Sequence, residues 1–96
     1  MPHFISLMRW TSTGRAGLPA WRDRVEEGER MIEEAGGKLV GVWVTLGQYD
    51  VVEVFDAPSD EVALEIITKL QRHGAEETET LRAFTRDEAE AIIRKL

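Results

Sequence analysis

The stretch from Lys38 to Asp56 constrains the fold more than any other part of the chain. Two valine-rich runs flank the pair Gly47-Gln48, which predicts a strand, a tight turn and a second strand. Both runs are apolar at successive positions, so both faces of the resulting sheet need cover. A chain of 96 residues has too few helices to cover two faces. The sequence therefore predicts that a second copy of the chain covers one of them.

The first third of the chain predicts a strand, a loop and a helix. Residues 3–11 are apolar on both faces of an extended run, which indicates a strand. Residues 12–17 are polar and contain glycine, so they predict a loop. Residues 18–35 place apolar side chains at three- and four-residue spacing, which is typical of one helix face. Gly36-Gly37 predicts the end of this helix.

The part that follows the paired strands predicts a helix, a strand and a last helix. The helix covers residues 60–72 and ends before Gly74, and the strand covers residues 78–84. Thr85 and Glu88 have the spacing of a capping box, so a short helix is expected from there to the end of the chain. Its inward-facing residues are expected to be Ala89, Ile92 and Ile93.

This order of elements, β-α-β-β-α-β-α, predicts the α+β class. Right-handed crossovers fold it into a ferredoxin-like βαββαβ unit with an extra C-terminal helix, in which a four-stranded antiparallel sheet carries both main helices on one face. We expect one domain over residues 1–96. Because soluble monomers rarely expose large apolar patches, the sequence predicts a homodimer through the helix-free sheet face.

Composition narrows the classes of partner. The net charge of −6 and the lack of a Lys/Arg cluster argue against nucleic-acid binding. No apolar run approaches the length of a membrane span, and the chain has no cysteine, so a cytoplasmic protein is expected. His3 and His73 are the two imidazoles, and their spacing does not fit a metal or haem site. We therefore expect no metal and no cofactor.

Tyr49 and Asp50 form a polar pair beside an apolar strand. If Leu46 pairs with Tyr49, then Asp50 shares a face with Trp43, whereas Tyr49 shares the other face with Glu53. Asp50 then has two interpretations. It bonds backbone amides or a nearby hydroxyl at the start of its strand, or it lines a pocket with Tyr49 and binds a small polar ligand.

Glu53 and Arg82 are charged residues in predicted strands. A buried Glu53 would have a raised pKa and be a candidate general base, whereas the alternative is a salt bridge to Arg82 or Arg9. Arg82 either clamps a carboxylate ligand in bidentate fashion or pairs with Glu79 or Glu53. Trp43 is a candidate pocket or interface residue, and His3 is a further pocket candidate. The candidate ligand-binding residues are thus Tyr49, Asp50, Glu53, Arg82, Trp43 and His3.

Several motifs in a fixed order resemble the GYD domain family, which is named for Gly-x-Tyr-Asp. They are Gly47-Gln48-Tyr49-Asp50, Ala57-Pro58-Ser59-Asp60-Glu61, the segment from Thr78 to Thr85, Gly36-Gly37-Lys38 and the closing pattern from Glu88 to Leu96. The resemblance covers nearly the whole chain. It implies a dimeric α+β barrel, a superfamily that includes cofactor-free oxygenases, small isomerases and haem-dependent enzymes. It implies no particular reaction, because fold does not determine function.

Three classes of function stay open at this point. The first is a small-molecule binding or regulatory module without turnover, favoured because no nucleophile or base constellation is recognisable. The second, by analogy with the barrel superfamily, is a cofactor-free oxygenase or isomerase of a small aromatic or keto compound. In that case Glu53 or Asp50 would abstract a proton, and Arg82 would stabilise the enolate. The third is a structural assembly unit whose interior is filled.

Overall fold

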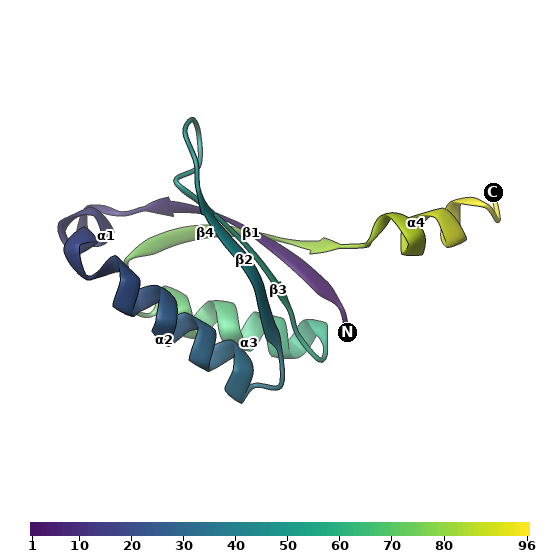
Figure 1. Cartoon of the computed structure of the whole chain (residues 1–96), viewed down its shortest axis with the longest axis horizontal. Helices are drawn as coiled ribbons and strands as arrows, with labels where there is room; N and C mark the ends of the chain where they lie inside the picture. The colour runs from purple at the N-terminus through teal and green to yellow at the C-terminus, as the bar shows by residue number, and fades with distance from the viewer.

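Strand β1 (His3–Trp10) lies inside a four-stranded antiparallel sheet with the order β2-β3-β1-β4. The computed structural model describes residues 1–96 (Figure 1). After β1 come α1 (Ser12–Ala16), the 3-10 turn η1 (Leu18–Ala20), α2 (Trp21–Glu34), β2 (Lys38–Val44), β3 (Val51–Asp56), α3 (Asp60–Gln71), β4 (Glu76–Ala83) and α4 (Arg86–Ile93). The predicted α+β, ferredoxin-like class is confirmed.

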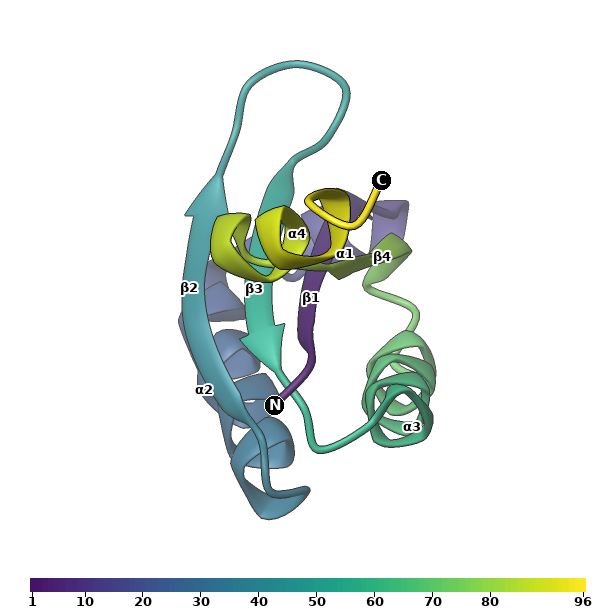
Figure 2. The same cartoon turned by 90° about the vertical axis from the view of Figure 1, so that its right-hand side faces the viewer.

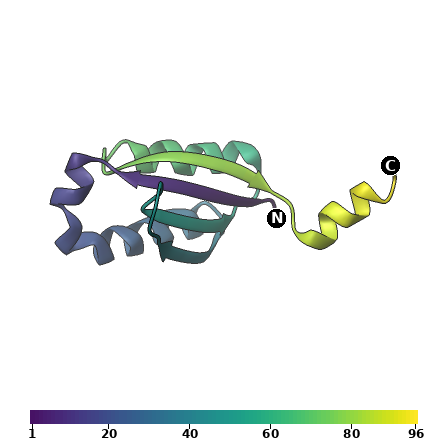
Figure 3. The ribbon, with the colours of Figure 1, turned by 90° about the horizontal axis from the view of Figure 1, so that it is seen from above.

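Helices α2 and α3 cover the same face of the sheet. Seen from above, α3 lies along β4 and α2 lies on the side of β2 (Figure 3). The strand register decides which side chains meet them. Phe4, Ser6 and Met8 of β1 are buried and alternate with partly exposed neighbours, so these three point toward the helices. Sequence patterning does not select this face, because both faces of β1 are apolar.

The hydrophobic core occupies the half of this layer that lies near the start of α3. The rings of Phe4 and Phe55 stack with their centroids 5.4 Å apart. Ile32 of α2 and Ile66 and Ile67 of α3 close over them and are buried. Burial of each such side chain contributes about 1.5–3 kcal/mol to the stability of the fold. This half of the layer therefore holds α2 and α3 on the sheet.

Residues 12–17 are predicted to be a loop, and this prediction is wrong in part. The structure forms the short helix α1 there, because the Thr11 side chain accepts a hydrogen bond from the Gly14 backbone N–H (3.1 Å) and caps the helix. The turn η1 follows, with Pro19 as its second residue. This arrangement leads the chain from the end of β1 down to α2.

The connection between β2 and β3 is longer than the predicted two-residue turn. The ladder ends at Val44 and Val51, and the Thr45 backbone N–H then donates to the Asp50 carbonyl over 2.8 Å. The loop stands away from the sheet on the side opposite the helices (Figures 1 and 2). Gly47 at its tip has φ of 105°, as turn chemistry predicts. Trp43 pairs with Val52 across the two strands.

The sheet face opposite α2 and α3 has no helix over it within the chain, and we call it the open face. Trp43 and Leu81 lie on it and expose 53% and 42% of their surface. Its other apolar members are Ile5, Leu7, Val52 and Val54. The chain thus has the uncovered sheet face on which the predicted homodimer depends.

Helix α4 extends away from the domain (Figure 1). Its capping box is confirmed: the Thr85 side chain and Glu88 each accept the other's backbone N–H. The prediction that Ile92 and Ile93 face inward is wrong, because these side chains are 53% and 60% exposed. Strand β4 directs the helix beyond the ends of the strands rather than back over the sheet (Figure 1). No helix has the length and apolar character that a membrane span requires.

Candidate ligand-binding site

A cavity of about 260 Å³ lies between the sheet and the helices, in the half of the layer near α1. Its apolar wall comes from Met8 and Val51 of the sheet, Trp21 and Met31 of α2 and Leu70 of α3. Space remains there because Gly28 of α2 presents no side chain toward Leu70. The cavity therefore results from a small residue where α2 faces α3 rather than from a missing element.

Glu53 of β3 lines this cavity. It pairs across the strands with Ser6 of β1 and Val42 of β2, so it shares the face that meets the helices. Burial, and then the charge of Glu76, raise the pKa of the Glu53 carboxyl to about 7. The alternative of a salt bridge from Glu53 to Arg82 or Arg9 is wrong, because neither arginine is among its charged neighbours. Glu53 is thus a largely buried carboxyl without a counter-ion.

Four further ionisable side chains line the cavity and come from other elements: Arg24 and Glu27 of α2, His73 after α3 and Glu76 of β4. Burial raises the pKa of Glu76, at the start of β4, while Arg24 of α2 and His73 after α3 lower it. The Arg24 guanidinium donates to the Gly14 carbonyl over 3.4 Å, and its Nε is buried without a hydrogen-bond partner. None of these residues is among the candidates predicted from the sequence.

A signal for two of them does exist in the sequence. Arg24 follows Trp21 by three positions, so both lie on the same side of α2. Glu76 alternates with Thr78 and Thr80, which places it on the helix-facing side of β4. The sequence does not show that Arg24 and Glu76 line the same cavity as Glu53.

Asp50 bonds backbone, as one of its two interpretations predicts. Its Oδ2 accepts the Trp10 N–H over 2.9 Å, and its own N–H donates to the Met8 carbonyl over 2.8 Å. These bonds attach the end of the β2–β3 loop to β1. Asp50 is not among the residues that line the cavity.

Tyr49 and Trp43 lie on the open face. The Tyr49 hydroxyl donates to Glu79 over 2.8 Å, and the Arg9 guanidinium lies 4.9 Å from the Tyr49 ring centre. The hydrogen bond to Glu79 raises the pKa of Tyr49. The prediction that Tyr49 shares a face with Glu53 is wrong, because strand alternation ends at Val51. Trp43 lies over Gly41, where a Cβ atom would come within 2.5 Å of its ring.

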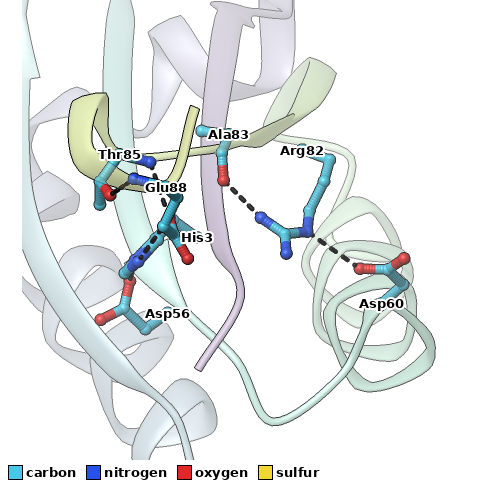
Figure 4. A network of polar contacts seen from close by, with 7 residues as sticks. All are labelled: His3, Asp56, Asp60, Arg82, Ala83, Thr85 and Glu88. Atoms are coloured by element: carbon cyan, nitrogen blue, oxygen red, sulfur yellow. Dashed lines mark hydrogen bonds and ion pairs between the residues drawn. The ribbon is translucent and has the colours of Figure 1, made fainter. Parts of the chain in front are cut away.

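His3 and Arg82 lie near the junction of β4 and α4 (Figure 4), and neither lines the cavity. His3 Nδ1 is 2.5 Å from Asp56, and its Nε2 is 3.6 Å from Glu88. Arg82 Nε is 3.4 Å from Asp60, so its predicted pairing with Glu79 or Glu53 is wrong. These contacts join the start of β1 to the end of β3 and to α4, and they join the end of β4 to the start of α3.

The six candidate residues therefore do not form one site. Glu53 alone lines the cavity. Tyr49 and Trp43 lie on the open face, Asp50 bonds the backbone of β1, and His3 and Arg82 belong to the polar network near the junction of β4 and α4. The geometry that can hold a small molecule is centred on Glu53 and on residues of α2 and β4.

Solved structures share this fold. The protein TTHA0845 from Thermus thermophilus is 24% identical, with a TM-score of 0.57 over 88% of this chain and 95% of that one. The 5-chloro-2-hydroxyhydroquinone dehydrochlorinase TftG from Burkholderia phenoliruptrix AC1100, solved with 2,5-dihydroxybenzoquinone, is 10% identical, with a TM-score of 0.62 over 91% and 97%. Atu4242 from Agrobacterium tumefaciens, a nipsnap family protein with unknown function, is 19% identical, with a TM-score of 0.51 over 90% and 92%.

At these identities the similarity establishes the fold and not the activity. Among curated proteins, no sequence matches this chain significantly. The model of the GYD domain matches residues 4–93, which include every strand and helix of the structure apart from His3 at the start of β1. This match confirms the resemblance that the sequence motifs indicate, and the chain belongs to the GYD domain family.

Proposed function

We propose that the protein is a small-molecule binding or regulatory module whose ligand occupies the cavity between the sheet and helices α2 and α3. The observation that carries this proposal is Glu53, a largely buried carboxyl without a counter-ion that lines an apolar cavity. A buried ionisable group costs stability unless it is paired. A bound ligand that supplies the partner of Glu53 would offset this cost.

The cavity has the properties of a small ligand site. Drug-sized ligands occupy pockets of about 300–1,000 Å³ that are mostly apolar with a few convergent polar groups. A cavity of about 260 Å³ suits a compound with one ring. The TftG structure, which shares the fold, was solved with a one-ring compound, which supports the size class but not the identity of the ligand.

We further propose that the module is a homodimer through the open face. Trp43 and Leu81 expose large apolar surfaces there, and two such faces would cover each other. With the helices on the outside, the cavity stays accessible in this dimer, because it lies on the other side of the sheet. The net charge of −6 disfavours nucleic acid as the partner.

A second candidate is a cofactor-free oxygenase or isomerase. A pKa of about 7 at Glu53 is the value that suits a general base near neutral pH. Arg82 does not line the cavity, so Arg24, whose buried Nε lacks a partner, would stabilise the developing negative charge. A purely structural unit with a filled interior is the least favoured class, because the cavity is open.

Fragment binding followed by amide NMR tests the proposed function. We expect one-ring fragments to shift signals of cavity residues such as Val51, Glu53 and Leu70, and not those of the open face. Gly28→Leu extends a side chain into the cavity and should abolish these shifts, whereas Gly28→Ala, which meets Leu70 at ordinary contact distance (3.6 Å), should weaken them less. Shifts confined to the open face would overturn the proposal.

The enzyme candidate makes a separate prediction. If Glu53 abstracts a proton from a bound carbon acid, the protein should accelerate exchange of that proton with deuterated water, and Glu53→Gln should abolish the acceleration while binding persists. Binding without exchange favours the binding module.

A further inference from the structure

We infer that the ligand of the cavity is a neutral one-ring compound with a carbonyl group, whose oxygen accepts a hydrogen bond from the Arg24 guanidinium. This inference deepens the proposed function and rests on it. The unpaired donor of Arg24, the apolar wall of the cavity and the cost of a negative charge within it support the inference.

Arg24 lines the cavity but lacks a full set of acceptors within the chain. Its Nη2 donates to the Gly14 carbonyl over 3.4 Å, which is long for a hydrogen bond of this kind. Its Nε is buried without a partner, and the ion pairs of the chain do not include Arg24. A buried donor that is left unpaired lowers stability. A molecule bound in the cavity can supply the missing acceptor.

Arg24 determines which kind of polar group the ligand presents, whereas Glu53 does not. A guanidinium has only donors and keeps its proton at every physiological pH, so its partner has to be an acceptor. A carboxyl donates when it is protonated and accepts when it is ionised, so Glu53 is compatible with either kind of group. An ammonium group would bring further donors and a like charge to Arg24. The ligand therefore presents an acceptor oxygen.

The cavity disfavours an acceptor that carries a negative charge. Burial is the largest of the effects that raise the pKa of Glu53 on β3 and of Glu76 on β4. At Glu76 this effect exceeds the opposing effect of the Arg24 charge. A carboxylate ligand would lose its hydration in the same way. A carbonyl oxygen accepts a hydrogen bond from Arg24 without a net charge, so it avoids this cost.

The remaining wall of the cavity suits an apolar ring. It includes Met8 and Val51 of the sheet and Leu70 of α3. Trp21 of α2 lines the same space, and an indole stacks favourably on another aromatic ring. The volume of about 260 Å³ leaves room for one ring with a short carbonyl substituent.

Four one-ring probes test the inference by amide NMR titration. Acetophenone carries the carbonyl, and α-methylstyrene has a methylene group in place of its oxygen. Benzoate supplies an anionic acceptor, and benzylamine supplies a cation without an acceptor. We expect acetophenone to bind about tenfold more tightly than α-methylstyrene, as for one hydrogen bond from a charged donor. It should also bind more tightly than benzoate and benzylamine.

Arg24→Met identifies the donor. It removes every N–H of the side chain and keeps an unbranched apolar stem in the wall of the cavity, so most of the tenfold preference for acetophenone should disappear. Binding of α-methylstyrene should be unchanged, which shows that the variant keeps its cavity. Arg30→Met is the matched control at an exposed position of α2 outside the cavity, and it should leave the preference as it is in the natural chain.

The outcomes separate this inference from the proposed function. If acetophenone and α-methylstyrene bind the natural chain equally, if benzoate or benzylamine binds more tightly than acetophenone, or if Arg24→Met keeps the preference, the carbonyl inference is wrong and the cavity site stands. The comparison of probes on the natural chain is decisive even where Arg24→Met unfolds. If none of the four probes binds and no fragment shifts the cavity signals, both proposals are wrong.

Discussion

Glu53 on β3 and Glu76 on β4 face the same cavity, and the charge of Glu76 helps to raise the pKa of Glu53 to about 7. The two carboxyls come from strands that are separated by β1 in the sheet. No opposite charge acts on Glu53, whereas Arg24 and His73 lower the pKa of Glu76. Glu53 is a largely buried hydrogen-bond acceptor in a mostly apolar cavity. The proposed ligand site rests on this combination.

The first prediction concerns the pH dependence of stability. The folded-state pKa of Glu53 lies above its ordinary value of 4.5, so the folded protein binds the proton more tightly than the unfolded chain does. The associated stability is fully present below pH 4.5 and is lost as pH rises through about 7. The loss amounts to about 3 kcal/mol at most. Chemical denaturation at pH 5 and pH 8 measures it.

Glu53→Gln isolates this contribution from the other carboxylates. The variant cannot ionise, so its free energy of unfolding should fall less than that of the natural chain between pH 5 and pH 8, and it should be the more stable of the two at pH 8. Equal pH dependence in the two proteins would show that Glu53 is solvated.

The second prediction concerns Asp50. Asp50→Asn replaces a charged acceptor of the Trp10 N–H by a neutral one, which should lower the free energy of unfolding by about 1 kcal/mol. Asp23→Asn, at an exposed position of α2, is the matched control and should change it by a few tenths. Fragment binding in the cavity should be unaffected by either change. If Asp50→Asn lost fragment binding without losing stability, Asp50 would belong to the ligand site.

The third prediction concerns the close approach of α1 to the start of β4. A Cβ atom at Gly14 would lie 2.0 Å from the Ala75 carbonyl oxygen, whereas one at Gly17 would have no neighbour nearer than 3.6 Å. Gly14→Ala should therefore cost at least about 1–3 kcal/mol of stability, and Gly17→Ala should cost much less. Thermal unfolding of the two variants measures the difference. Similar melting temperatures would mean that α1 does not pack on Ala75.

The fourth prediction concerns the proposed homodimer. Leu81→Glu places a charge on the open face, and Leu64→Glu places the same charge on the outer side of α3, where Leu64 is 66% exposed. Sedimentation analysis should show that Leu81→Glu dissociates into monomers and that Leu64→Glu stays dimeric. A natural chain that sediments as a monomer, or dimers that persist in Leu81→Glu, would contradict the open face as the interface.

The fold follows from the sequence because its signals are local. Apolar spacing defines α2 and α3, and the capping box of Thr85 and Glu88 defines the start of α4. The predictions are wrong where a contact between residues far apart in the sequence determines the local structure. Helix α1 depends on capping by Thr11, which also donates to the Gly74 carbonyl, and the direction of α4 depends on how β4 leaves the sheet. Neither feature has a periodic signature.

The site follows from the sequence only in part. Glu53 can be identified from the sequence because a carboxylate buried between two valines of a central strand lowers stability unless it has a partner. Tyr49 and Asp50 belong to the motif that names the family, yet here they hold the β2–β3 loop to Glu79 and Trp10. Arg24 and Glu76 join Glu53 only through tertiary packing.

The pKa of Glu53 is the most direct test of the proposed ligand site. The carboxyl carbon shift of Glu53, followed by NMR from pH 4 to pH 9, reports its ionisation without a ligand. We predict a midpoint of about 7 for the Glu53 carboxyl. A midpoint near the ordinary value of 4.5 would show a hydrated or paired carboxylate, and it would remove the reason for placing a ligand in the cavity.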